Sequence, residues 1–144
     1  MTAFAGSSLV VAWVQAAATT TLTGDHRSCS YTPSIGMYDQ TAGADGNKSY
    51  IPGVKDGTWT FNAVMQGGTD SGGTTVYNTV AEGNIGTLFV YPEGLTAGLS
   101  KYAYPSISQG AAFSWPYDNV CEVTVNGQQN GARVEGTTNG TAGA

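Results

Sequence analysis

Few side chains in this sequence could carry out catalysis, and their spacing matches none of the common arrangements. The only histidine, His26, lies between Asp25 and Arg27 in a predicted loop, so any triad of serine, histidine and carboxylate would have to use it. A solvated loop residue is the simpler interpretation. Cys29 and Cys121 have neither metal-site spacing nor a dense disulfide framework, which favours two free thiols over a disulfide between them.

Two further motifs resemble binding loops but lack essential residues. Asp45-Gly46-Asn47 is similar to part of a calcium-binding loop, yet the alternate oxygen ligands and the terminal glutamate are missing. The glycine pairs at 67–68 and 72–73 flank Asp70 without the lysine and hydroxyl residue of a phosphate-binding loop. The sequence therefore predicts no enzyme, no metal site and no cofactor.

The composition predicts a single folded domain with a nearly neutral surface. The chain has 144 residues, and 10% of them are Asp, Glu, Lys or Arg, against about 25% in typical globular domains. Charged residues are depleted at the centres of protein interfaces, so part of the exterior is expected to contact other proteins, although an ordinary hydroxyl-rich surface would also fit. We expect the domain to span residues 1–136, followed by a polar tail at 137–144 that is frayed or engaged only by a neighbouring molecule.

The charge balance argues against a face that binds nucleic acid. The net charge is -5, and the five basic residues are spread from Arg27 to Arg133, whereas phosphate binding needs clustered cations. This charge balance does not argue against a protein that lets DNA pass without binding it. The apolar residues 9–14 have no basic residue before them, as a secretory signal would, and are too few to span a bilayer. We expect synthesis in the cytoplasm and no contact with a membrane.

Short apolar-alternating segments separated by Gly, Asn, Asp and Pro predict a mainly β fold. One segment departs from this pattern, because residues 74–82 have N-cap threonines and helical spacing of apolar residues, with Gly83 as a stop signal. We expect one short helix there, packed against a sheet. Two Asn-Gly pairs, at 126–127 and 130–131, are both candidates for a hairpin turn. The predicted strands are residues 8–14, 28–34, 49–51, 58–65, 85–91, 100–107, 112–117, 120–125 and 132–135.

The stretch SYIPGVKDGTWTFNAVMQ, residues 49–66, predicts a sharp turn that leads into a strand. Proline fixes φ and glycine permits turn conformations, so we expect a corner at Pro52, Gly53, Asp56 and Gly57. In the strand that follows, alternation places Trp59, Phe61, Ala63 and Met65 on one face, which we expect to be buried. The same reasoning places Phe113, Trp115 and Tyr117 together, with Pro116 at a strand end or sheet edge.

From residue 6 to about 136, the order of these elements resembles that of the major tail tube proteins of long-tailed siphophages. An acidic residue, a spacer and a threonine precede a glycine-containing loop, an aromatic-aliphatic pair, Pro-Gly, an acidic-Gly pair and an alternating strand. A short helix, a strand ending in Pro-x-Gly and the final strands follow. The matching residues are Tyr38-Asp39-Gln40-Thr41, the loop 42–48, Tyr50-Ile51, Pro52-Gly53, Asp56-Gly57, the strand 58–65, the helix 74–82 and TLFVYPEG at 87–94.

The resemblance implies a β-sandwich or split barrel with one flanking helix, and a structural subunit of the virion tail. Such subunits form hexameric rings that stack into a tube, and their sheets join into a barrel that lines a channel for DNA. The implied partners are further copies of the chain, a tape measure protein and a tail terminator, while DNA passes without specific binding through a neutral or acidic lining. The long polar loop is expected to reach the next ring, and its residues are Asp39, Gln40, Thr41, Asp45, Asn47 and Lys48.

Two other kinds of protein remain open. A head-decoration or tail-terminator protein would share the β-rich, weakly charged composition but would form a trimer or a single ring. A carbohydrate-binding β-sandwich could use Trp13, Trp59 and Trp115 as stacking platforms, although two of these share faces with Phe and Met, as core residues do.

Overall fold

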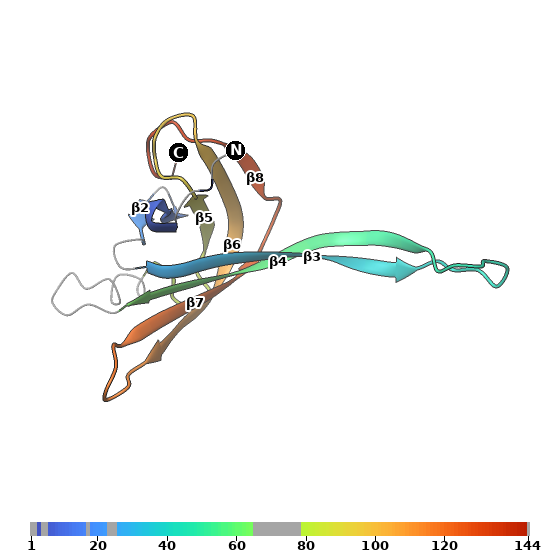
Figure 1. Cartoon of the computed structure of the whole chain (residues 1–144), viewed down its shortest axis with the longest axis horizontal. Coiled ribbons are helices and arrows are strands. Elements are labelled where there is room, and N and C mark those ends of the chain that lie inside the picture. The colour runs from blue at the N-terminus through green and yellow to red at the C-terminus, as the bar shows by residue number, and fades with distance from the viewer. Residues whose placement is uncertain (1–2, 4–5, 17, 23–25, 65–78, 144) are drawn as a thin grey trace.

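The structure is a computed structural model that describes residues 3, 6–16, 18–22, 26–64 and 79–143 (Figure 1). These residues form one short 3-10 helix and eight strands, and every predicted strand coincides at least in part with one of them. The elements are η1 (Gly6–Ser8), β1 (Val10–Gln15), β2 (Ala18–Thr21), β3 (His26–Asp39), β4 (Tyr50–Val64), β5 (Ile85–Tyr91), β6 (Ser100–Ser114), β7 (Glu122–Gln129) and β8 (Val134–Thr137).

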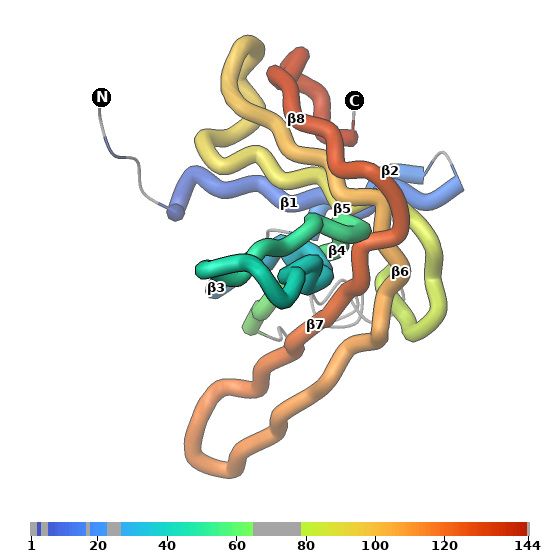
Figure 2. The backbone as a smooth tube through the Cα atoms, turned by 90° about the vertical axis from the view of Figure 1, so that its right-hand side faces the viewer, coloured from blue at the N-terminus to red at the C-terminus, as the bar shows by residue number. Residues whose placement is uncertain are grey.

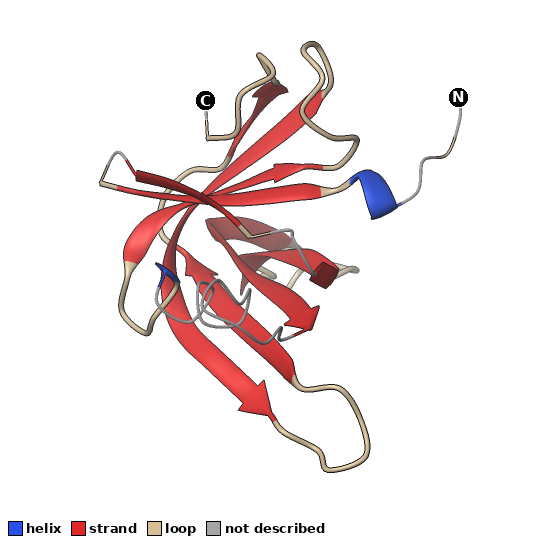
Figure 3. Ribbon diagram, turned by 90° about the vertical axis from the view of Figure 1, so that its left-hand side faces the viewer, coloured by secondary structure: helices blue, strands red, loops and turns tan. Residues whose placement is uncertain are grey.

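The strands form one antiparallel sheet in the order β2-β1-β5-β6-β7-β4-β3. The long strand β6 also pairs with β8, through Ser100 to Ala103, whereas its pairing with β7 begins at Ser106. The sheet bends over on itself, so that strands far apart in this order face each other (Figures 2 and 3). Tyr31 of β3 stacks on Tyr104 of β6 with ring centroids 4.0 Å apart, and Trp13 of β1 lies 5.9 Å from Trp59 of β4. The predicted mainly β fold, of sandwich or split-barrel form, is confirmed.

The core lies between the two layers of this bent sheet. Trp59 is 1% exposed, and its indole N–H donates to Ser106 Oγ at 2.9 Å, so the one polar atom of the ring is paired. Met65, which the alternation also placed on this inner face, lies outside the described residues. The core cluster consists of Val11, Trp13, Leu22, Trp59, Phe61, Ala63, Val80, Leu88, Tyr104, Val123 and Val125.

Neither Asn-Gly pair closes a hairpin. Asn126 and Gly127 lie inside β7, where Gly127 pairs with Trp59, and a Cβ atom on this glycine would come within 2.0 Å of the indole ring. The glycine therefore makes room for the largest core side chain. Asn130 and Gly131 follow β7, and Gly131 has a φ of 129°, but β7 and β8 both pair with β6 and not with each other.

We expect Gly127→Ala to lower the free energy of unfolding by about 1–3 kcal/mol, because the added methyl group must displace the Trp59 ring from a close-packed core. Denaturant unfolding followed by tryptophan fluorescence measures this change. Gly136→Ala is the matched control, since a Cβ atom there would meet nothing within 4 Å. Equal stability of the two variants would show that the ring can shift without cost.

Strands β3 and β4 extend beyond the rest of the sheet as a two-stranded ribbon, here called the arm (residues 33–57; Figure 1). The pairing of β4 with β7 begins only at Thr58, whereas its pairing with β3 continues to Tyr50. The predicted corner is therefore wrong, because β4 runs from Tyr50 to Val64 without a turn. The residues that the corner prediction named, Pro52, Gly53, Asp56 and Gly57, all lie within this strand.

Tyrosines on β3 explain the two glycines that the arm has on β4. A Cβ atom on Gly53 would lie 2.5 Å from the ring of Tyr38, and one on Gly57 would lie 2.5 Å from the hydroxyl of Tyr31. Each tyrosine thus lies over a glycine of the neighbouring strand, which leaves space for the ring. Pro52 is accommodated because this part of β4 has a partner on one side only.

The remaining predictions have mixed outcomes. The helix expected at 74–82 falls mainly on residues outside those described, so it stays a prediction. Gly83 has a φ of 86°, a conformation that favours glycine. The short strand β2 was not predicted. The tail is not frayed, because Thr137 belongs to β8, Thr138 is buried, and the backbone N–H of Gly143 donates to the hydroxyl of Tyr91 at 2.7 Å.

Candidate assembly surfaces

The arm exposes apolar side chains and unpaired strand edges. Within the described part of the chain, no strand pairs with the free side of β3 or with residues 50–57 of β4 on the side away from β3. Such edges are templates for pairing with another chain. The large apolar side chains exposed on the arm are Ile35, Met37, Tyr38, Tyr50, Ile51 and Val54.

Hydrogen bonds order the loop at the tip of the arm. The carboxylate of Asp39 accepts from the backbone N–H of Thr41 at 2.8 Å, and its hydrogen bonds with Thr41 lower the pKa of Asp39. Gln40 donates from its backbone N–H to the carbonyl oxygen of Ser49 at 2.9 Å, and from Nε2 to Ser49 Oγ at 2.7 Å. The Asp45 carboxylate accepts from the backbone N–H three residues before it, at 2.7 Å. Asp39 is the last residue of β3, and the loop between it and β4 contains the other residues predicted at this tip, Gln40, Thr41, Asp45, Asn47 and Lys48.

The face of strands β3, β4 and β7 that points away from the core carries hydroxyl and amide side chains. Strand register aligns them in rows across the sheet, for example Ser28 beside Asn62 beside Thr124, and Ser30 beside Thr60 beside Asn126. We call this surface the polar face, and it consists of Ser28, Ser30, Thr32, Thr58, Thr60, Asn62, Thr124, Asn126 and Gln128.

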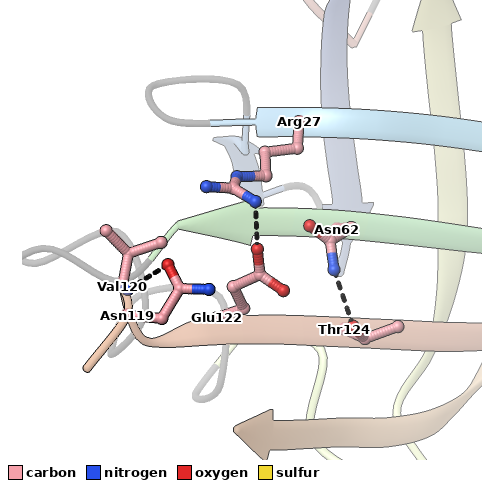
Figure 4. A network of polar contacts seen from close by, with 6 residues as sticks. All are labelled: Arg27, Asn62, Asn119, Val120, Glu122 and Thr124. Atoms are coloured by element: carbon pink, nitrogen blue, oxygen red, sulfur yellow. Dashed lines mark hydrogen bonds and ion pairs between the residues drawn. The ribbon is translucent and has the colours of Figure 1, made fainter. Parts of the chain in front are cut away.

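Hydrogen bonds across the strands satisfy part of the polar face. Asn62 Nδ2 donates to Thr124 Oγ1 at 2.8 Å, as Figure 4 shows, and Thr60 Oγ1 donates to Asn126 Oδ1 at 3.0 Å. Side chains that are bonded to each other have fewer donors free for a passing ligand. The surface is therefore polar and uncharged, with some of its bonding capacity already used.

Charged groups occur at the margins of the polar face, where they have partners. Arg27 donates to Glu122 in an ion pair that spans β4 (Figure 4). At the other end, the carboxylate of Asp56 accepts from Gln128 Nε2 at 2.6 Å and from the backbone N–H of Gly57 at 2.8 Å. These contacts reduce the ability of each charged group to bind an external ion.

Trp115 is not on a buried face, contrary to the alternation that grouped it with core residues. Strand β6 ends at Ser114, and Trp115 lies beyond it, 68% exposed and stacked on Phe113 with ring centroids 5.3 Å apart. The carbohydrate-binding alternative offered Trp13, Trp59 and Trp115 as possible stacking platforms. Trp13 and Trp59 are buried in the core, so they cannot serve as platforms.

The cysteines and acidic residues of the described ranges form neither a disulfide nor a cluster that could hold a metal ion. Cys29 and Cys121 are free thiols, as predicted, and burial raises the pKa of Cys29 to about 11. Within the ranges given above, no three His, Cys, Asp or Glu side chains lie close enough together to hold a metal ion. None of the helical residues among them forms a segment long and apolar enough to cross a membrane.

Comparisons with known proteins identify the fold. Neither a family model nor a curated protein matches the sequence. Among solved structures, the tail of an empty gene transfer agent particle with C6 symmetry has a TM-score of 0.70 at 12% identity, over 92% of this chain and 98% of that one. The SPP1 tail tube has a TM-score of 0.71 at 10% identity, over 94% of this chain and 80% of that one.

A contractile assembly gives a similar result. A chain from the sheath-tube complex of an extracellular contractile injection system has a TM-score of 0.61 at 11% identity, and 90% of this chain and 88% of that one are covered. The chain therefore has the fold of tail tube proteins, and the resemblance that the order of its sequence elements indicated is confirmed at the level of the fold.

Proposed function

We propose that this protein is the structural subunit of a non-contractile phage tail tube, in which hexameric rings stack around a channel for DNA. The observation that carries the proposal is the arm, with its exposed apolar side chains and two free strand edges. A monomer gains nothing from such an extension, whereas a polymer can bury it. The likeness of the fold to assembled tail tubes supports the same conclusion.

Ring closure follows from the unpaired edges of the sheet. Strand β3, with 14 residues, forms one end of the strand order and β2, with four residues, forms the other. Because the two ends differ in length and sequence, copies associate head to tail, and six copies close a ring. The four residues of β2 can cover only part of β3, so the free edges of the arm are left for contacts with neighbouring subunits. The tip of the arm then reaches the neighbouring ring through Asp39, Asp45 and Lys48.

The polar face is the surface that we assign to the lining of the channel. DNA is arrested by clustered cations, and this face has hydroxyl and amide groups with its one arginine paired to Glu122. The lining is thus neutral rather than strongly acidic, within the range that the sequence allowed. DNA slides past such a surface without specific binding, and the protein acts neither as an enzyme nor through a cofactor.

The proposed tube has further protein partners and belongs to the virion. The tube carries a tape measure protein within it and a tail terminator at its end, and it is a component of the virion that is synthesised and assembled in the cytoplasm of a bacterial host. No membrane takes part.

Negative-stain electron microscopy of the purified protein tests the proposal. We expect hollow tubes of stacked rings, because all the contacts of the assembly come from copies of one chain. Trimers would favour a head-decoration protein, and isolated rings that never stack would favour a tail terminator. A protein that stays monomeric at high concentration would contradict the proposal.

The lining is tested by adding positive charge to the polar face. We expect the double variant Ser30→Lys and Asn126→Lys to assemble into tubes that retain short DNA duplexes, with retention lost as salt is raised. Co-sedimentation of labelled duplexes with tubes measures retention. Ser30→Gln with Asn126→Gln is the matched control, because it adds bulk without charge. If tubes of the lysine variant retained no DNA at low salt, the polar face would not line the channel.

A further inference from the structure

A groove lies at the base of the arm, where the arm meets the segment between β7 and β8. It encloses about 900 Å³, and its apolar wall is formed by Pro33, Ile35 and Val54 of the arm together with Ala132 of that segment. Ile35 and Val54 are exposed, the latter at 81%. Contiguous exposed apolar side chains of this kind mark contact sites on soluble proteins.

The charged side chains of the groove give it a net positive charge. Lys55 and Arg133 line it, and the single acidic lining residue, Asp56, is engaged by Gln128 Nε2 at 2.6 Å. Arg133 lies 3.8 Å from Glu135, which is a weak exposed ion pair. Lys55 is thus a cation at the rim that can meet an acidic group of another molecule.

The loop between β6 and β7 has exposed aromatic side chains and an acidic residue, which complement the apolar wall and the positive charge of the groove. The loop at residues 115–121, here called the aromatic loop, joins β6 to β7 and exposes Trp115 and Tyr117, the latter completely. It carries Asp118 and no basic residue. Because Trp115 is stacked on Phe113, it is held in place before any contact, which lowers the entropy cost of docking. Rigid aromatic anchors of this type dominate the energy of many interfaces.

Lys55 of the groove and the Trp115 ring of the aromatic loop lie on the side of the sheet that the polar face does not occupy, whereas Asp56 of the groove lies at the margin of the polar face. Phe113 pairs with the buried Val123, so the Trp115 ring stacked on it lies on the core side of β6. Lys55 is on the same side of β4 as the buried Trp59, from which it is four residues distant. A contact that uses Lys55 and the Trp115 ring would therefore form on the core side of the sheet, away from the hydroxyl and amide rows of the polar face.

The two features cannot meet within one molecule, because the aromatic loop projects away from the arm on the other side of the body (Figures 1 and 2). We propose that the aromatic loop of one copy inserts into the groove of a copy in the next ring, with Trp115 and Tyr117 against the apolar wall and Asp118 beside Lys55. This inference rests on the proposed tube function and adds a second stacking contact to the tip of the arm. The match is head to tail, so it propagates along a tube without closing.

The first experiment uses a double variant that carries both Trp115→Ala and Tyr117→Ala. Sedimentation velocity and negative-stain microscopy compare it with wild type. We expect rings in both samples, but tubes at least tenfold shorter in the variant. Circular dichroism checks that its melting temperature is unchanged, as both side chains are exposed. Tubes of wild-type length would overturn the inference, and a variant that stays monomeric would overturn the placement of the contact between rings.

A charge exchange identifies the groove as the partner. We expect Asp118→Lys and Lys55→Glu each to shorten the tubes at low salt, and the double variant to recover at least half of the wild-type length. Glu82→Lys with Lys55→Glu is the control, because Glu82 is an exposed acidic residue beside Gly110 that takes part in neither proposed stacking contact. A double variant no better than either single variant would exclude the groove. Failure of the tube function itself is distinct, since wild type would then form no tubes.

Discussion

Trp59→Ala is expected to lower the free energy of unfolding by about 3–5 kcal/mol, the range for truncating a large buried aromatic residue. The indole ring is 1% exposed, lies 5.9 Å from the ring of Trp13 and donates to Ser106 Oγ at 2.9 Å. Removing it leaves a cavity between the two layers of the sheet and a buried hydroxyl with one partner fewer. Since domains are stable by about 5–15 kcal/mol, the variant would be close to unfolding.

Thermal and denaturant unfolding followed by circular dichroism measure the effect. Trp115→Ala provides a matched control, since it removes the same side chain from an exposed loop and is expected to leave the stability of the monomer almost unchanged. If both variants melted like wild type, the Trp59 ring would not support the core as its burial indicates.

Shortening the tip of the arm is expected to abolish the stacking of rings while the monomer stays folded. Replacing residues 42–47 by Asn-Gly keeps Gln40 and Ser49, whose hydrogen bonds close the ribbon, and removes Asp45 and Asn47. No core side chain is lost, and the entropy of loop closure changes slowly with loop length. The rings should therefore form with normal melting temperature but fail to grow into tubes.

A second variant separates the length of the loop from its charge. Replacing the same six positions by a Gly-Ser sequence keeps the length of the arm but removes Asp45. If the Gly-Ser variant forms tubes and the shortened variant does not, stacking depends on the length of the loop and not on its charge. Sedimentation velocity and microscopy provide the measurement. Long tubes from the shortened variant would show that the tip is not needed, and would leave the aromatic loop as the stacking contact.

The inward face of β4 was predictable because burial there follows the two-residue period of a strand. Trp59 and Phe61 recur at that period between polar residues, and both are buried. The strand at 85–91 has the bounds expected from its apolar run, which stands between turn residues. In both cases the pattern is local, so neighbours in sequence carry the whole signal.

The arm was not predictable from such patterns. Pro52-Gly53 and Asp56-Gly57 have the composition of turns, but each glycine here makes space for a tyrosine on β3. That relation depends on the register of two strands, and Tyr38 lies 15 positions before Gly53 along the chain. Local sequence cannot distinguish a glycine that bends the backbone from one covered by a distant ring.

The candidate surfaces show the same limit. Thr58, Thr60 and Asn62 were visible as the outer side of one strand, but their alignment with β3 and β7 into a continuous polar face needs the sheet order. Trp115 was misassigned because its alternation was extended past Ser114, where the strand ends before Pro116. A proline two residues beyond a strand is a signal that could have placed this tryptophan in a loop.

The arm also bears on how fast a polymer of this subunit begins to grow. A ribbon of two strands without a third is only marginally stable in water, so we expect a free energy cost for fixing the arm when a free subunit makes its first contact. When two free subunits associate, both arms must be ordered. When a subunit joins the end of an existing tube, only its own arm must be ordered, because the arms in the tube already are. If the protein forms the proposed tube, nucleation is then slow and elongation fast, so we expect tubes to appear after a lag that added seeds shorten.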